Sequence, residues 1–95
     1  MAVYVILDIV VHNPEAYEEY KTKVVPIIQK YGGRYLVRGG AHQVIEGDWH
    51  PTRLAVLEFP SMEAAQQFAS APEYQPVKAI REANATSHTV VVEGV

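Results

Sequence analysis

The run VYVILDIVV, residues 3–11, constrains the fold more than any other part of this chain. Every residue in it except Asp8 is aliphatic or aromatic. Such residues favour strands, and a run that is apolar at both alternating positions is typical of a strand covered on both faces. We therefore expect a central strand in a sheet that needs cover on each side.

A helix is expected directly after this strand. Asn13 is a good N-cap, and Pro14 suits the first helical position. Apolar residues then recur at helical spacing as far as the glycine pair at 32–33, which is expected to end the helix. Pro26 lies inside this stretch. Because proline removes a backbone hydrogen bond and crowds the preceding turn, it predicts a kink or break.

The rest of the chain predicts two more helices and three more strands. A long second strand is expected from Arg34 to Glu46, bent or bulged at the glycine pair at 39–40. The other expected elements are a hairpin connection at 47–52, a strand at 53–59, a helix after Ser61, a short helix after a capping box at 70–73, and a strand at 88–93.

This order of elements predicts an α+β fold, the ferredoxin-like split βαβ arrangement, in a single domain spanning residues 1–95. It has one four-stranded antiparallel sheet with helices on one face. The first and third strands are expected to be central and parallel neighbours. Since the helices cover only one face of a sheet that is apolar on both, a second copy of the sheet would cover the other. We therefore expect a homodimer.

Composition excludes several classes of function. The net charge is −3 and no run of lysines and arginines exists, so nucleic acid is not an expected partner. The chain has no cysteine, which excludes thiol catalysis and thiolate metal sites. The histidines lack metal-ligand spacing, so neither a metal nor another cofactor is expected. No apolar run is long enough to span a membrane and no signal peptide is evident, so the expected location is the cytoplasm.

Asp8 is the first candidate for a functional residue. An unpaired buried carboxylate is costly, so Asp8 needs a partner or water. Glu58 lies near the end of the third strand, and Arg34 and Arg38 are expected on one face of the second strand as counter-ions. We predict that Asp8, Arg38 and Glu58 form a polar cluster lining a pocket. The alternative is that they form ion pairs at a sheet edge or dimer interface.

Tyrosines form a second group of candidates. Tyr17 and Tyr20 lie on the stripe of the first helix, and Tyr74 lies at the later short helix. Each offers an apolar ring with a polar tip, which suits a ligand pocket as well as a core. We predict that these three tyrosines line the pocket, with packing in the core as the alternative.

His12 is the candidate general base. It follows the first strand directly, and it is expected to approach His88 if the first and last strands pair. The alternative is a surface or interface histidine. Together with Asp8, it is one of two candidate catalytic residues.

Several segments together carry a family resemblance. They are PEAYEEY, KYGGRYLVRGG, VIEGDW, RLAVLEFPS, SAPEYQPV and the closing TSHTVVVEG. They resemble the domain of unknown function 1330, within the dimeric α+β-barrel group that also holds muconolactone isomerases and antibiotic-biosynthesis monooxygenases. The resemblance covers essentially the whole chain. It implies a ferredoxin-like protomer, a dimer with facing sheets, and a small-molecule pocket between sheet and helices, but no reaction.

Three readings of function follow. The leading one is a small homodimeric protein whose pocket accommodates a small, partly apolar organic molecule. The first alternative is a cofactor-independent isomerase or monooxygenase that uses His12, Asp8 or a tyrosine for proton transfer. The second alternative is a structural dimer without a ligand. The enzyme needs an enclosed cavity with a base of shifted pKa, the binding protein needs only the cavity, and the structural dimer needs neither.

Overall fold

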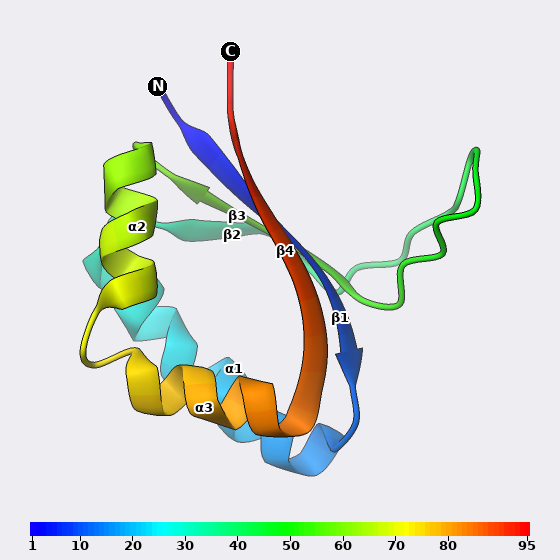
Figure 1. Cartoon of the computed structure of the whole chain (residues 1–95), viewed down its shortest axis with the longest axis horizontal. Coiled ribbons are helices and arrows are strands. Elements are labelled where there is room, and N and C mark those ends of the chain that lie inside the picture. Colours follow the sequence, from blue (N-terminus) through cyan, green and yellow to red (C-terminus); the bar gives the residue numbers. More distant parts are fainter.

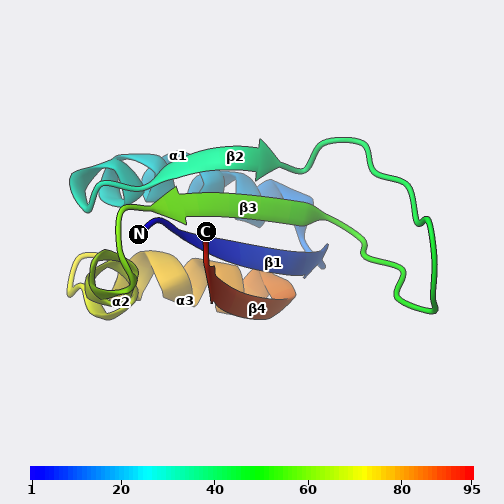
Figure 2. The same ribbon diagram turned by 90° about the horizontal axis from the view of Figure 1, so that it is seen from above.

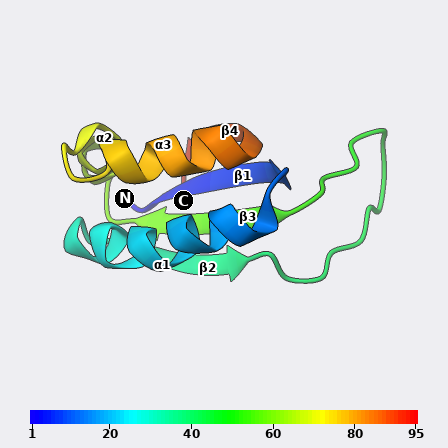
Figure 3. The same ribbon diagram turned by 90° about the horizontal axis from the view of Figure 1, so that it is seen from below.

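Four strands and three helices follow one another in the computed structural model, which describes residues 1–95 (Figure 1). The helices lie on one face of the sheet (Figure 3). The elements are β1 (Val3–Val11), α1 (Pro14–Lys30), β2 (Arg34–Arg38), β3 (Leu54–Phe59), α2 (Met62–Ser70), α3 (Gln75–Asn84) and β4 (Ala85–Glu93). The expected ferredoxin-like α+β protomer is confirmed.

The sheet has the strand order β2-β3-β1-β4, visible from above in Figure 2. Neighbouring strands are antiparallel throughout, with Val3 opposite Phe59 in the central pair. The expectation that β1 and β3 run parallel was wrong. Helix α1 returns the chain so that β2 runs in the direction of β1. The strand β3 then comes back between them, and it must therefore oppose both.

The expected long second strand was also wrong. β2 ends at Arg38, and residues 39–53 form a loop that extends away from the sheet (Figures 1 and 2). The bulge expected at the glycines lies instead between Tyr35 and Val37, where the pairing with β3 shifts by one residue. Because one extra residue reverses the alternation of side chains, Arg34 lies on the outer face and Arg38 on the helix-covered face.

Helix α1 begins as predicted but is not broken. The Asn13 side chain accepts a hydrogen bond from the Ala16 amide at 3.2 Å. The helix continues through Pro26 to Lys30, so the predicted break is absent. Proline removes only one hydrogen bond of the helix, whereas the buried residues Val24 and Ile28 hold the stretch around it against the core.

The capping box predicted for the short helix is not formed. α3 begins at Gln75, and its N-cap residue, Tyr74, makes no side-chain cap. Glu73 instead accepts hydrogen bonds from Lys30 and Tyr31, at 2.6 Å each, at the end of α1. The local pattern predicted that the Glu73 carboxylate would cap the start of α3. The tertiary fold instead brings Lys30 and Tyr31 close enough to bind it.

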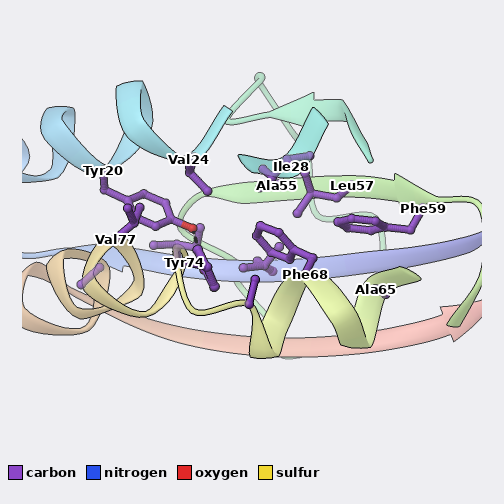
Figure 4. Packing of buried hydrophobic residues seen from close by; sticks show 14 of the residues in the cluster. Tyr20, Val24, Ile28, Ala55, Leu57, Phe59, Ala65, Phe68, Tyr74 and Val77 are labelled. Atoms are coloured by element: carbon purple, nitrogen blue, oxygen red, sulfur yellow. Dashed lines mark hydrogen bonds between the residues drawn. The ribbon is translucent and has the colours of Figure 1, made fainter. Parts of the chain in front are cut away.

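The hydrophobic core lies between the sheet and the helices (Figure 4). It is built from the odd-numbered residues of β1 and β3 and from the inner faces of the helices, with Val3, Val24, Ile28 and Phe59 almost fully buried. The even-numbered positions of β1, β3 and β4 form the outer face of the sheet, where no helix lies. Val10, Val90 and Val92 are 41%, 59% and 48% exposed there. This face therefore carries exposed valines among a few charged residues, and no helix covers it.

Candidate functional site

A cavity of about 250 Å³ lies between the sheet and helices α2 and α3. It is called the apolar cavity below, because ten of its 14 lining residues are hydrophobic. The register pairs Val5 with Val91 and Leu7 with Thr89, so all four reach it from the helix-covered face. Phe68 lines it from α2. A ligand pocket was expected between sheet and helices, and that this cavity binds a ligand stays a prediction.

Two of the predicted tyrosines line this cavity and contact each other. The hydroxyls of Tyr20, from α1, and Tyr74, just before α3, are hydrogen-bonded at 3.1 Å, and both residues are buried. Figure 4 shows Tyr20 reaching toward Tyr74. Burial, reinforced by the neighbouring Tyr74 hydroxyl, raises the pKa of Tyr20 far above its usual value. The hydroxyl therefore stays protonated and acts as a hydrogen-bonding group, not as a base.

Arg81 of α3 also lines the apolar cavity, and sequence reasoning missed it. Burial opposes its charge, yet the hydroxyls of Tyr74 and Tyr20 hold the pKa of Arg81 above its ordinary value. Its Nε atom is buried without a hydrogen-bond partner, so donor capacity remains unused. A signal existed: Lys78 and Arg81 follow Tyr74 and Val77 at helical spacing, so two cations lie on the same side of α3 as apolar residues, and both line the cavity.

Tyr17 lies beside Tyr20, outside the lining of the apolar cavity. Its ring centroid is 5.4 Å from that of Tyr20, and the residue is buried. Burial raises the pKa of Tyr17. Of the three predicted tyrosines, the structure therefore places two at the cavity and one in the packing behind it.

The predicted cluster of Asp8, Arg38 and Glu58 is not formed. Asp8 lies opposite Leu54, whereas Glu58 lies opposite Tyr4, four residues away along β1. At about 3.3 Å per residue this separates the two carboxylates by roughly 13 Å of strand. Their partners differ too, because Glu58 pairs with Arg34 at 2.8 Å and Arg38 lies on the other face of the sheet.

Asp8 instead anchors the 39–53 loop. Its carboxylate accepts hydrogen bonds from Trp49 Nε1 and from the Thr52 amide, each at 3.0 Å. These two bonds lower the pKa of Asp8. His88 is its partner in β4. Asp8 therefore lies on the outer face of the sheet, away from the apolar cavity.

His12 lies at the far end of β1, outside the lining of the apolar cavity. Its Nε2 atom is 2.7 Å from Thr86 Oγ1. The predicted approach to His88 was wrong, because the register sets His88 opposite Asp8 and so separates the two histidines along the strands. The roles of His12 and Asp8 as a general base remain predictions.

Groups that could hold a metal ion are absent, since no three His, Asp or Glu side chains gather closely enough. None of the three helices combines the length and apolar character needed to cross a membrane. The arrangement at the apolar cavity can enclose an apolar body and present hydroxyl and guanidinium groups to it.

Comparison with known proteins gives one family. The sequence profile described as "Domain of unknown function (DUF1330)" matches residues 2–95. No curated protein matches the chain. The earlier resemblance to this family is thus confirmed.

Solved structures share the fold at low sequence identity. The RPA0582 protein of unknown function from Rhodopseudomonas palustris has a TM-score of 0.81 and 20% identity, over 99% of this chain and 82% of its own. SnoaB, a cofactor-independent oxygenase from Streptomyces nogalater, has a TM-score of 0.70 and 14% identity, over 99% and 93%. A dimeric ferredoxin-like protein of unknown function from Jannaschia sp. CCS1 has a TM-score of 0.67 and 14% identity, over 99% and 100%.

Proposed function

Because this chain belongs to the family of domain of unknown function 1330, whose description names no activity, we propose a function from the chain's own cavity. The protein is a homodimer that binds a small organic molecule with an apolar body and one anionic group. The observation that carries this proposal is the apolar cavity, whose lining includes the hydrogen-bonded hydroxyls of Tyr20 and Tyr74 and the cations Lys78 and Arg81.

The size and lining of the cavity support a small ligand. Pockets for drug-sized molecules usually measure about 300–1,000 Å³ and combine apolar walls with a few polar groups. At about 250 Å³, this cavity suits a molecule of one or two rings. The charge of Arg81 favours an anionic group on the ligand, and the two hydroxyls offer hydrogen bonds to it.

The uncovered outer face supports the dimer. Exposed apolar patches of this kind commonly mark association surfaces. Val10, Val90 and Val92 lie on it, and Ile45 and Trp49 of the 39–53 loop are 86% and 60% exposed. One protein of the same fold is described as dimeric. A second copy that packs its sheet on this one would cover these side chains.

The enzyme alternative has less support from this geometry. SnoaB, which shares the fold, is described as a cofactor-independent oxygenase. In this chain the candidate bases Asp8 and His12 lie outside the apolar cavity, and Tyr20 holds its proton. Binding without chemistry therefore fits the cavity better than proton transfer by these residues.

The test is a titration of the protein with 1-naphthoate, in which isothermal titration calorimetry measures the binding affinity. Its uncharged analogue 1-naphthamide has the same rings without the carboxylate. We expect saturable binding of 1-naphthoate, weaker binding of the amide, and an affinity lowered at least fivefold by Arg81→Gln. The matched control is Arg34→Gln, which removes the same charge on the outer face and leaves the affinity unchanged. Equal losses in both variants, or no binding, would contradict the proposal.

A further inference from the structure

A second depression lies between α1 and the adjoining ends of β2 and β3. It is an open cleft of about 490 Å³, called the basic cleft below. It shares no lining residue with the apolar cavity. Its six lining residues are Glu18, Lys21, Thr22, Val25, Arg38 and Arg53.

The charges in the basic cleft are unbalanced. Lys21 pairs with Glu18 at 2.9 Å, which uses the one carboxylate among the lining residues. Arg38 and Arg53 form no ion pair within the chain. Arg38 and Arg53 therefore share one cleft with a single carboxylate, that of Glu18, although the chain as a whole has a net charge of −3. An anion placed between the two guanidinium groups would be attracted by both.

Arg38 is held in place by contacts that leave much of its guanidinium free. The bulge in β2 turns it onto the helix-covered face. Its Nη2 atom donates to the Lys21 carbonyl at 2.6 Å, and its guanidinium lies 4.7 Å from the centre of the Tyr35 ring. These contacts orient the guanidinium, and most of its five N–H donors remain for another partner.

The Arg53 guanidinium packs closely against the backbone of Gly39. Gly39 has a φ of +71°, and a Cβ at this position would overlap the Arg53 guanidinium. The amide of Gly39 donates to the Leu54 carbonyl at 2.7 Å, which fixes the glycine backbone against the start of β3. The Nε atom of Arg53 is buried and has no hydrogen-bond partner. A buried donor usually has an acceptor, and the chain supplies none to this Nε atom.

We propose that the basic cleft binds an oxyanion, a carboxylate or phosphate group of a small molecule, between the guanidinium groups of Arg38 and Arg53. Planar guanidinium groups match the paired oxygens of both anions. Lys21 lies in the same cleft, where Glu18 balances its charge. The basic cleft shares no lining residue with the apolar cavity. This proposal can therefore be tested independently of the function proposed above.

The experiment titrates inorganic phosphate and, separately, acetate into the ¹⁵N-labelled full chain at low ionic strength. Amide chemical shifts report the binding. We expect saturable shifts at Lys21, Gly39 and Arg53. Arg53→Gln should weaken binding of the preferred probe at least tenfold, and Arg34→Gln, whose charge is already paired with Glu58 on the outer face, should change it less than twofold. Tighter phosphate binding assigns the site to phosphate groups, and tighter acetate binding assigns it to carboxylates.

If Arg53→Gln unfolds the chain, Arg38→Lys is the second variant that tests the proposal. Arg38 is exposed, so the change should be tolerated, and it keeps the charge while removing the planar fork. A loss of at least threefold in affinity is expected. Shifts that never saturate, or equal losses in Arg34→Gln, would overturn the proposal. If Arg81→Gln weakens the binding of 1-naphthoate and Arg38→Lys does not, the apolar cavity and the basic cleft are two distinct sites.

Discussion

Gly33 has no room for a side chain. A Cβ at this position would lie 2.6 Å from Cε1 of Phe59 and 2.9 Å from Cγ2 of Ile28, both in the core. Neither neighbour can move far, because Phe59 and Ile28 are almost completely buried. The glycine that follows α1 is therefore a packing requirement, in addition to any role in ending the helix.

Gly33→Ala is expected to destabilise the protein by about 1–3 kcal/mol, the usual cost of overpacking a core. The measurement is the free energy of unfolding from urea denaturation. Gly40→Ala is the matched control, since a Cβ there meets nothing within 4 Å. If both variants unfold at the same urea concentration, the close approach at Gly33 does not affect the free energy of unfolding.

At the scale of single elements, Glu73 ties the end of α1 to the start of α3. Its carboxylate accepts hydrogen bonds from Lys30 and from the Tyr31 hydroxyl. The bond from Lys30, followed by that from Tyr31, lowers the pKa of Glu73 below its ordinary value of 4.5. A carboxyl whose pKa is lower in the folded state stabilises that state above pH 4.5. This stabilisation is lost as the pH falls through the lower folded pKa.

Glu73→Gln is therefore expected to be less stable than the parent protein at pH 7, and the difference is expected to be smaller at pH 3, because the stabilisation is lost progressively below pH 4.5. Urea denaturation at both pH values measures this. Glu46→Gln, in the exposed 39–53 loop, is the control and should match the parent at both. A difference between Glu73→Gln and the parent that persists unchanged at pH 3 would show that the carboxylate charge is not responsible.

At the scale of the whole molecule, the two faces of the sheet differ in cover. Helices bury one face, whereas the outer face keeps exposed valines on β1 and β4. A chain of 95 residues buries a modest share of its surface alone, so covering this face by a second copy would add stability.

Val90→Glu is expected to convert the proposed dimer into a monomer, because it places a charge among the exposed valines of the outer face. Size-exclusion chromatography with light scattering measures the mass. Gln29→Glu adds the same negative charge on exposed α1 and should leave the dimer intact. A parent protein that is already monomeric, or a dimeric Val90→Glu variant, would rule out this face as the interface.

Local patterns in the sequence were enough to determine the order of elements and the core. The run at residues 3–11 became β1, Asn13 caps α1, and the helical stripe of Tyr20 and Val24 is buried. These features depend on alternation, helical spacing and capping, which act between residues close along the chain. The fold class followed from that order, since few topologies accommodate it.

Only the tertiary structure decided which polar side chains meet. The bulge between Tyr35 and Val37 moved Arg38 to the opposite face from Arg34, and the β1–β3 register separated Asp8 from Glu58. Bulges and registers are set by pairing between distant segments, and a shift of one residue reverses every side chain beyond it. The sequence by itself therefore determined the framework of this protein, while long-range strand pairing and the packing of the helices on the sheet decided the composition of the apolar cavity and the basic cleft.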